Sequence, residues 1–122
     1  MRCWVALVCL VGAGCSSAVH DLPASAPTPA QAPAPATLLS AAKVAANQAK
    51  FVGPVEVSAV REAHPLAAAP YISCIRGTNS TRPTTQTIAL FFKGDSLAGS
   101  RLSVQLDNCE AQAFTVLGNA PF

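Results

Sequence analysis

The amino-terminal third of the chain limits what the rest can fold into, because it has the composition of a spacer. Residues 23–37, PASAPTPAQAPAPAT, are almost entirely Pro, Ala, Ser and Thr. Such a segment favours the extended polyproline II conformation and lacks the side chains that build a core. Of the 122 residues, 51% are hydrophobic, but much of that fraction is alanine, which buries little surface. We therefore predict one small domain, over residues 38–122.

A short apolar run before this spacer has the features of a sorting signal. Arg2 supplies one positive charge, and residues 4–11, WVALVCLV, are all apolar. A permanent membrane helix needs about 20 apolar residues, so a run this short fits the hydrophobic region of a secretory signal. Two alternatives stay open: ordinary secretion with cleavage after residues 24–26, and an apolar amino terminus of a cytoplasmic protein.

The end of the apolar run carries a second pattern. Residues 10–17, LVGAGCSS, place small residues before Cys15 and serines after it. They resemble the lipobox of bacterial lipoprotein precursors. The resemblance implies that residues 1–14 are a signal peptide, that the Cys15 sulfur carries a diacylglyceryl group, and that acyl chains such as palmitate anchor the protein, at about 0.8 kcal/mol per buried CH₂. In a Gram-negative cell, Ser16 implies sorting to the outer membrane, with residues 15–37 as lipidated cysteine and linker.

The signal and the lipid account for the odd number of cysteines, which is five. Cys3 and Cys9 lie in the signal and Cys15 carries the lipid, which leaves Cys74 and Cys109. A pair of cysteines in an exported protein indicates a disulfide. Closing that loop stabilises the fold by about 4 kcal/mol in the loop-entropy model. A redox site would favour a C-x-x-C spacing and a metal site would need more ligands, so we expect neither.

The pattern from residue 38 onward predicts one helix followed by short strands. Helix formers dominate up to residue 50, and Gly53-Pro54 is expected to end the helix. The predicted strands are 55–59, 71–76, 85–93, 101–107 and 111–117, with an exposed loop over 77–83. The predicted class is α+β: a mostly antiparallel sheet of four or five strands, one amino-terminal helix packed on it, and one disulfide.

Two of these strands have the clearest patterns. Residues 85–93, TQTIALFFK, are β-branched and aromatic, and alternate large apolar side chains fall on one face. Residues 101–107, RLSVQLD, alternate apolar and polar side chains, which predicts a half-buried strand.

A second resemblance covers roughly residues 50–115. The segments that carry it are Gly53 to Ser58, Arg61, Ala63 to Leu66, Cys74, Phe91 to Gly94, Ser100-Arg101, Asp107 and Cys109-Glu110. They resemble a group of small uncharacterised alphaproteobacterial lipoproteins. This resemblance implies no particular activity.

One motif suggests an enzyme. Gly94-Asp95-Ser96-Leu97 resembles the nucleophile block of GDSL-type esterases and lipases, which would make Ser96 a nucleophile. That family takes its base from a downstream Asp-x-x-His, whereas His20 and His64 both lie upstream here. A serine without a base within reach is not activated. We therefore expect a turn at this segment and no enzymatic activity or catalytic residue.

A few side chains are candidates for a partner surface. Arg61, Arg76 and Arg101 can share one face and bind an anionic envelope component, and Phe91 can add an apolar contact. Solvated strand-face charges and ordinary core packing are the open alternatives. His64 has no second ligand at metal spacing, so we expect no metal or cofactor.

Charge and composition favour a binding protein. The net charge is +2 and the eight basic residues are scattered, which excludes a strong nucleic-acid footprint. No small-molecule substrate is evident. We predict a lipid-anchored protein on the periplasmic side of the outer membrane that acts as a binding or assembly module for another envelope protein. The alternatives are a periplasmic inhibitor of a cell-wall hydrolase, a small GDSL-like esterase, and a soluble periplasmic or secreted location.

Overall fold

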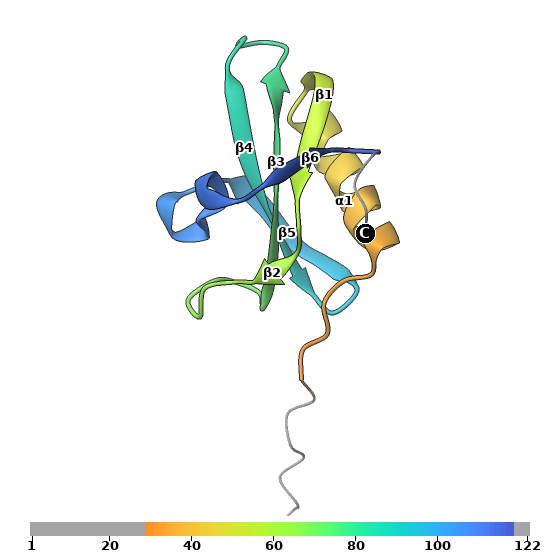
Figure 1. Ribbon diagram of the computed structural model, residues 1–122, viewed down its shortest axis with the longest axis vertical. Helices are drawn as coiled ribbons and strands as arrows, with labels where there is room; N and C mark the ends of the chain where they lie inside the picture. Colours follow the sequence, from red (N-terminus) through yellow and green to blue (C-terminus); the bar gives the residue numbers. More distant parts are fainter. Residues whose placement is uncertain (1–28, 119–122) are drawn as a thin grey trace, which may run out of the picture.

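The computed structural model describes residues 29–118, which form one helix and a mostly antiparallel sheet (Figure 1). The elements are α1 (Pro35–Gln48), β1 (Phe51–Ser58), β2 (Arg61–Glu62), β3 (Tyr71–Asn79), β4 (Thr85–Lys93), β5 (Ser96–Leu102), the 3-10 helices η1 (Gln105–Asp107) and η2 (Cys109–Ala111), and β6 (Phe114–Val116). The strand order is β5-β4-β3-β1-β6, and β2 pairs with β3. The predicted α+β class with one helix and one disulfide is confirmed.

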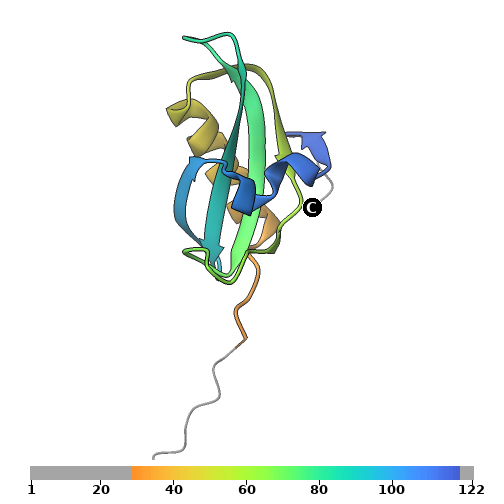
Figure 2. The same ribbon diagram turned by 90° about the vertical axis from the view of Figure 1, so that its left-hand side faces the viewer.

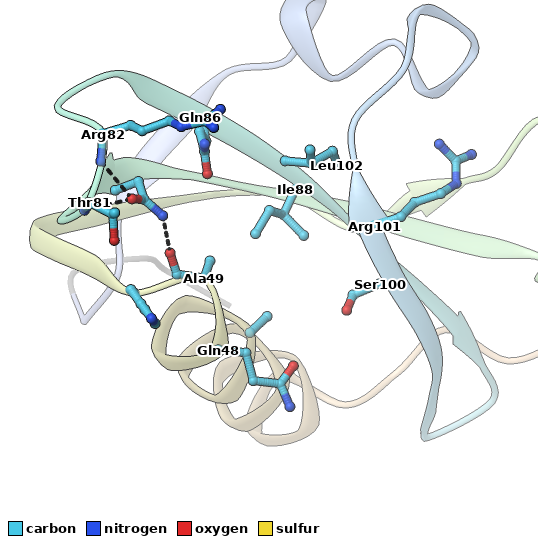
Figure 3. A pocket seen from close by; sticks show the side chains of 12 residues that line it. Gln48, Ala49, Thr81, Arg82, Gln86, Ile88, Ser100, Arg101 and Leu102 are labelled. Atoms are coloured by element: carbon cyan, nitrogen blue, oxygen red, sulfur yellow. Dashed lines mark hydrogen bonds between the residues drawn. The ribbon is translucent and has the colours of Figure 1, made fainter.

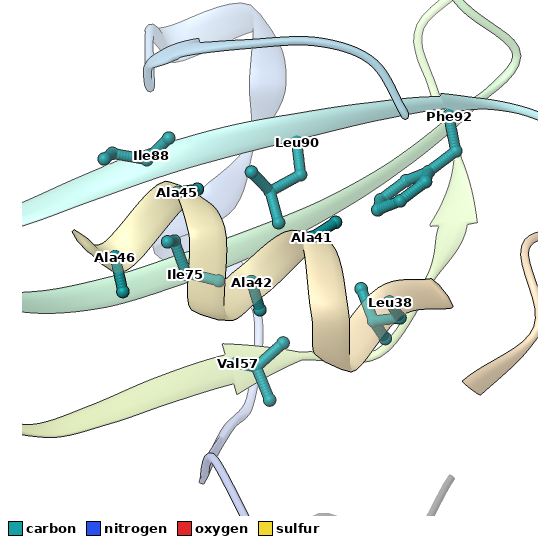
Figure 4. Close-up of a cluster of buried hydrophobic side chains, with 10 residues drawn as sticks. All are labelled: Leu38, Ala41, Ala42, Ala45, Ala46, Val57, Ile75, Ile88, Leu90 and Phe92. Atoms are coloured by element: carbon teal, nitrogen blue, oxygen red, sulfur yellow. The ribbon is translucent and has the colours of Figure 1, made fainter. Parts of the chain in front are cut away.

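Helix α1 packs on one face of the sheet and builds the main core (Figure 4). Pro35 starts the helix, where its missing N–H is not needed. Four of the five buried side chains of α1 are alanines, so the helix backbone can approach the strands closely. The core residues are Leu38, Ala41, Ala42, Ala45 and Ala46 of α1, with Val57, Ile75, Ile88, Leu90 and Phe92 of the strands.

The opposite face of the sheet is covered by the chain that follows β5, as Figure 1 and Figure 2 show. The two 3-10 helices lie over this face, and the chain then enters β6, which pairs with β1 at the edge of the sheet. A smaller cluster lies beneath them: Ala69, Ile72, Cys74, Ala89, Phe91 and Cys109. The Cys74–Cys109 disulfide, with Cα atoms 5.8 Å apart, ties β3 to η2. The central strands β3 and β4 are therefore buried on both faces.

Helix α1 and strand β1 lie earlier in the chain than predicted. The helix begins at Pro35 and ends at Gln48, and β1 already begins at Phe51. Gly53-Pro54 does not end the helix but lies inside β1, where the register with β3 shifts between Val52 and Glu56. Gly53 has a φ of 75°, which suits this irregularity.

Strand β3 also extends further than predicted, through residues 77–79 that we expected in a loop. Gly77 pairs with Gln86 of β4, and a Cβ at Gly77 would lie 2.5 Å from the Phe51 ring. The absence of a side chain at Gly77 thus gives Phe51 its place against the sheet.

The strand predicted over 101–107 is wrong. Strand β5 is Ser96–Leu102, every residue of it is exposed, and residues 105–107 form a 3-10 turn. Leu102, Val104 and Leu106 are 61%, 50% and 48% exposed, so the alternation does not mark a buried face. Instead Asp107 is buried, because it bonds to Arg101. The ion pair between Asp107 and Arg101, which lie six positions apart, overrides the apolar alternation here.

The end of the predicted spacer contacts the domain. Pro33 is buried, and the Tyr71 hydroxyl donates a hydrogen bond of 2.7 Å to the Ala30 carbonyl. The chain therefore reaches the domain at the end of the molecule that is opposite the tip of the β3–β4 hairpin (Figure 1). The predicted signal and Cys15 lie outside the described residues. Over residues 29–118, α1 is too short and polar to cross a membrane.

Candidate functional site

The three candidate arginines do lie on one face of the sheet. Arg61 pairs with Ile72, Arg101 pairs with Ala89, and Arg76 follows Cys74 by two positions in β3. This is the face away from α1, where the smaller cluster lies.

Each of these arginines is engaged within the domain. Arg101 donates two hydrogen bonds, of 2.7 and 2.8 Å, to the Asp107 carboxylate, and Arg61 donates to the Asp107 carbonyl. The Arg76 Nε lies 2.8 Å from Glu56 Oε2, and this hydrogen bond lowers the pKa of Glu56. These contacts support a structural role: Arg61 and Arg101 hold the segment after β5 on the sheet, and Arg76 links β3 to β1.

The aromatic rings beside the arginines are also part of this structure. The Arg101 guanidinium lies 4.9 Å from the centre of the Phe91 ring, and that of Arg76 lies 4.2 Å from the centre of the Phe114 ring. Phe91 is only 4% exposed, so the prediction that it offers an apolar contact to a partner is wrong. Its ring fills the space between the sheet and the segment that crosses it.

The GDSL-like segment forms the tight turn between β4 and β5. Gly94 has a φ of 58°, and Ser96 is an exposed residue paired with Lys93. The Asp95 carboxylate accepts a hydrogen bond of 2.8 Å from the Ala34 N–H at the start of α1. Hydrogen bonds from the Thr37 side chain and from Ala34 lower the pKa of Asp95. The acidic residue of the motif thus caps a helix, where a negative charge is favourable.

The remaining candidates for catalysis are also engaged locally. The His64 Nδ1 accepts a hydrogen bond of 3.2 Å from the Leu66 N–H. Within residues 29–118, no three His, Cys, Asp or Glu side chains lie close enough to hold a metal ion.

A hollow of about 490 Å³ lies between the end of α1, the β3–β4 hairpin and β5 (Figure 3). We call it the polar hollow. Its apolar residues are Ala45, Ala49, Ile88 and Leu102, and its polar residues are Gln48, Lys50, Asn79, Thr81, Arg82, Gln86, Ser100 and Arg101. The Arg101 side chain points away from it, toward the other side of β5 (Figure 3).

Asn79 holds the two walls of the polar hollow together. Its Nδ2 donates to the Ala49 carbonyl over 2.6 Å, and its Oδ1 accepts from the N–H groups of Thr81 and Arg82. The Ser80 N–H also donates to the carbonyl of Lys50. The hairpin tip is therefore fixed against the end of α1. The backbone of Lys50 and that of Arg82 are both held by these hydrogen bonds.

Sequence patterns did not reveal this hollow, because its walls come from segments about 30 positions apart. One local signal was present: Asn79 favours a turn in which its side chain accepts from the backbone two and three residues on. The Asn79 Nδ2 group donates to the Ala49 carbonyl, and the position of that carbonyl depends on how α1 ends. The chain turns after α1 at Lys50, which has a φ of 54° although it is not a glycine.

A second hollow, of about 600 Å³, lies at the end where the chain reaches the domain. Pro29 and Ala30 form part of its wall, together with His64, Tyr71 and Lys93. It therefore belongs to the attachment of the spacer.

Comparison with known proteins finds no matching family model, no similar curated protein and no similar solved structure. The chemistry of the described residues is therefore the basis on which we infer a function. That chemistry favours binding: a fixed hollow with hydrogen-bonding groups, two basic side chains and a small apolar floor.

Proposed function

We propose that this protein is a lipid-anchored binding module of the bacterial cell envelope, attached to the outer membrane through Cys15, with no catalytic role. The observation that carries the proposal is that the spacer and the polar hollow lie at opposite ends of the domain. The spacer reaches one end, and the polar hollow lies beside the β3–β4 hairpin at the other (Figure 1, Figure 3). An anchored domain of this shape presents its hollow away from the membrane.

The contacts of the spacer support this orientation. The Tyr71 hydroxyl bonds to Ala30, Pro33 is buried, and the Ala34 N–H bonds to Asp95. These contacts fix the direction in which the chain leaves the domain.

The Cys74–Cys109 disulfide supports export, because disulfides persist in oxidising compartments. The alanine-rich helix and the small second cluster give the domain a modest core. A covalent link is a common way to stabilise so small a domain outside the cytoplasm.

The anchor is tested with Cys15→Ser in the full chain, with Cys9→Ser as the matched control. We expect the Cys15→Ser protein to leave the membrane fraction and to lose incorporation of labelled palmitate, while the control keeps both. The proposal is wrong if Cys15→Ser fractionates with membranes as the unmodified chain does.

A further inference from the structure

We propose that the polar hollow binds the short, carboxylate-bearing peptides of the bacterial cell wall. This inference rests on the proposed function, which places the hollow in the periplasm and facing away from the outer membrane. It adds the class of ligand and the residues that recognise it: Lys50 and Arg82 for the carboxylates, and the side-chain amides and hydroxyls of the hollow for the peptide groups.

Charge is the first argument. Among the described residues that line the hollow, the charged ones are Lys50, Arg82 and Arg101, and none is acidic. Arg101 bonds to Asp107 on the other side of β5, so its charge is used there. Lys50 and Arg82 are exposed. Figure 3 shows the Arg82 side chain extended along the hairpin toward Gln86. The hollow is therefore electropositive and suits an anionic ligand.

The remaining lining suits a peptide. Gln48 and Gln86 offer both donors and acceptors, and the hydroxyl groups of Thr81 and Ser100 add more. These are the partners that peptide N–H and C=O groups need. The apolar residues are two alanines, Ile88 and Leu102, which match small aliphatic side chains. No aromatic ring lines the hollow among the described residues, so it lacks a flat surface on which a sugar ring could pack.

The hollow is also formed in advance of binding. Asn79 bonds at once to Ala49 on the helix side and to Thr81 and Arg82 on the hairpin side. A ligand therefore has little backbone to order, which lowers the cost of binding. Small peptides with few contacts depend on such preorganisation.

The test is cosedimentation of the full chain, extracted in detergent, with purified cell-wall sacculi. We expect binding that saturates and that weakens about tenfold, which equals about 1.4 kcal/mol, in the double variant Lys50→Gln with Arg82→Gln, because both of its exposed charges are then absent from the hollow. The matched control is Lys43→Gln with Lys93→Gln, which removes the same charge from two exposed lysines that do not line the hollow. We expect the control to bind within twofold of the unmodified chain.

Two further arms separate the hollow from general attraction. The unmodified chain should bind sacculi whose carboxylates have been amidated only as weakly as the double variant binds untreated sacculi. Ser100→Trp, on the exposed strand β5, should block the hollow sterically without a change in charge, and circular dichroism with thermal unfolding checks that each variant is folded.

Three outcomes overturn the inference. They are equal loss in the double variant and its control, undiminished binding to amidated sacculi, and absence of binding by the unmodified chain. If the chain fails to bind sacculi but still needs Cys15 for membrane attachment, the ligand is wrong and the anchored location stands. Saturable capture of an envelope protein through Lys50 and Arg82, without binding to sacculi, equally replaces the cell-wall peptide as the ligand.

Discussion

The Asp107 carboxylate holds the segment that covers the second face of the sheet, so Asp107→Ala should destabilise the domain strongly. Its side chain is 3% exposed and accepts hydrogen bonds from Arg101 over 2.7 and 2.8 Å and from the Val104 N–H over 2.9 Å. The substitution removes all three hydrogen bonds. It leaves the guanidinium and one backbone N–H without their acceptor.

The magnitude follows from the exposure of the two partners. Removing one member of a buried ion pair costs about 3–5 kcal/mol. The Arg101 side chain is 42% exposed and regains water, so part of that cost is not incurred. We therefore expect Asp107→Ala to lower the free energy of unfolding by about 2–3 kcal/mol. For a domain of this size, that corresponds to a drop in Tm of roughly 10–20 °C.

Urea unfolding of the oxidised protein, followed by circular dichroism, measures this loss. Glu110→Ala is the matched control, because Glu110 is an exposed carboxylate three positions further on, and its loss should cost less than about 0.5 kcal/mol. A double-mutant cycle with Arg101→Met should give a coupling of about 1–2 kcal/mol. If Asp107→Ala unfolds with the control, the carboxylate does not hold the segment and the reasoning fails.

Two further predictions concern a close contact and a helix cap. Gly77→Ala should cost about 1–3 kcal/mol, because the new Cβ would meet the Phe51 ring at 2.5 Å, whereas Gly99→Ala, with nothing within 4 Å, should be nearly neutral; urea midpoints of the two variants check this. The pKa of Asp95 is lowered in the folded state, so the stability that its carboxylate contributes is present above the ordinary pKa of 3.8 and is lost as the pH falls through the lower folded pKa. Asp95→Asn should therefore be less stable than the unmodified chain at pH 6 and equal to it near pH 2; an unchanged gap in the urea midpoints would contradict the cap.

Strand β4 shows which parts of the fold can be predicted from sequence. Its limits, Thr85–Lys93, agree with the prediction, and Ile88, Leu90 and Phe92 face α1 while Phe91 faces the other way. A central strand pairs with a neighbour on each side and packs against a core on each face. All of its positions are therefore in similar surroundings, and its apolar residues mark the whole length of the strand. The predicted Cys74–Cys109 disulfide is confirmed as well, and a bond between two distant cysteines depends little on the local conformation of either.

Residues 101–107 show the opposite case. Their apolar alternation is as regular as that of a half-buried strand, but β5 ends at Leu102 and lies at the edge of the sheet. What decides the conformation of the following residues is the pull of Asp107 toward Arg101 and of Cys109 toward Cys74. Cys74 becomes a neighbour of Cys109 only after the sheet has formed. Arg101 is close in sequence, but the apolar alternation does not predict the turn that brings Asp107 back to it. The polar hollow escapes sequence analysis for the same reason, because Asn79 joins segments that the topology brings together.

Helix α1 covers one face of the sheet by packing on it, whereas the covering of the second face is held by the Cys74–Cys109 disulfide. Over the described residues, that face is covered by two short 3-10 helices, and the cluster beneath them contains fewer large side chains than the cluster beneath α1. Closing a loop with a sequence separation of 35 contributes about 4 kcal/mol in the loop-entropy model. That is a large share of the 5–15 kcal/mol typical of small domains, so the reduced chain should lie close to its unfolding threshold.

The folded state of this protein should therefore depend on the redox state of its surroundings. We expect Cys74→Ala with Cys109→Ala, or reduction of the unmodified chain, to lower the free energy of unfolding by about 3–4 kcal/mol. Urea unfolding with and without a thiol reductant measures the difference, and the double variant should not respond to the reductant. Equal urea midpoints for the oxidised and reduced chains would show that the crossing segment packs on the sheet without the bond. A loss of the expected size means that the domain gains a large part of its stability only after the disulfide forms, which requires an oxidising compartment.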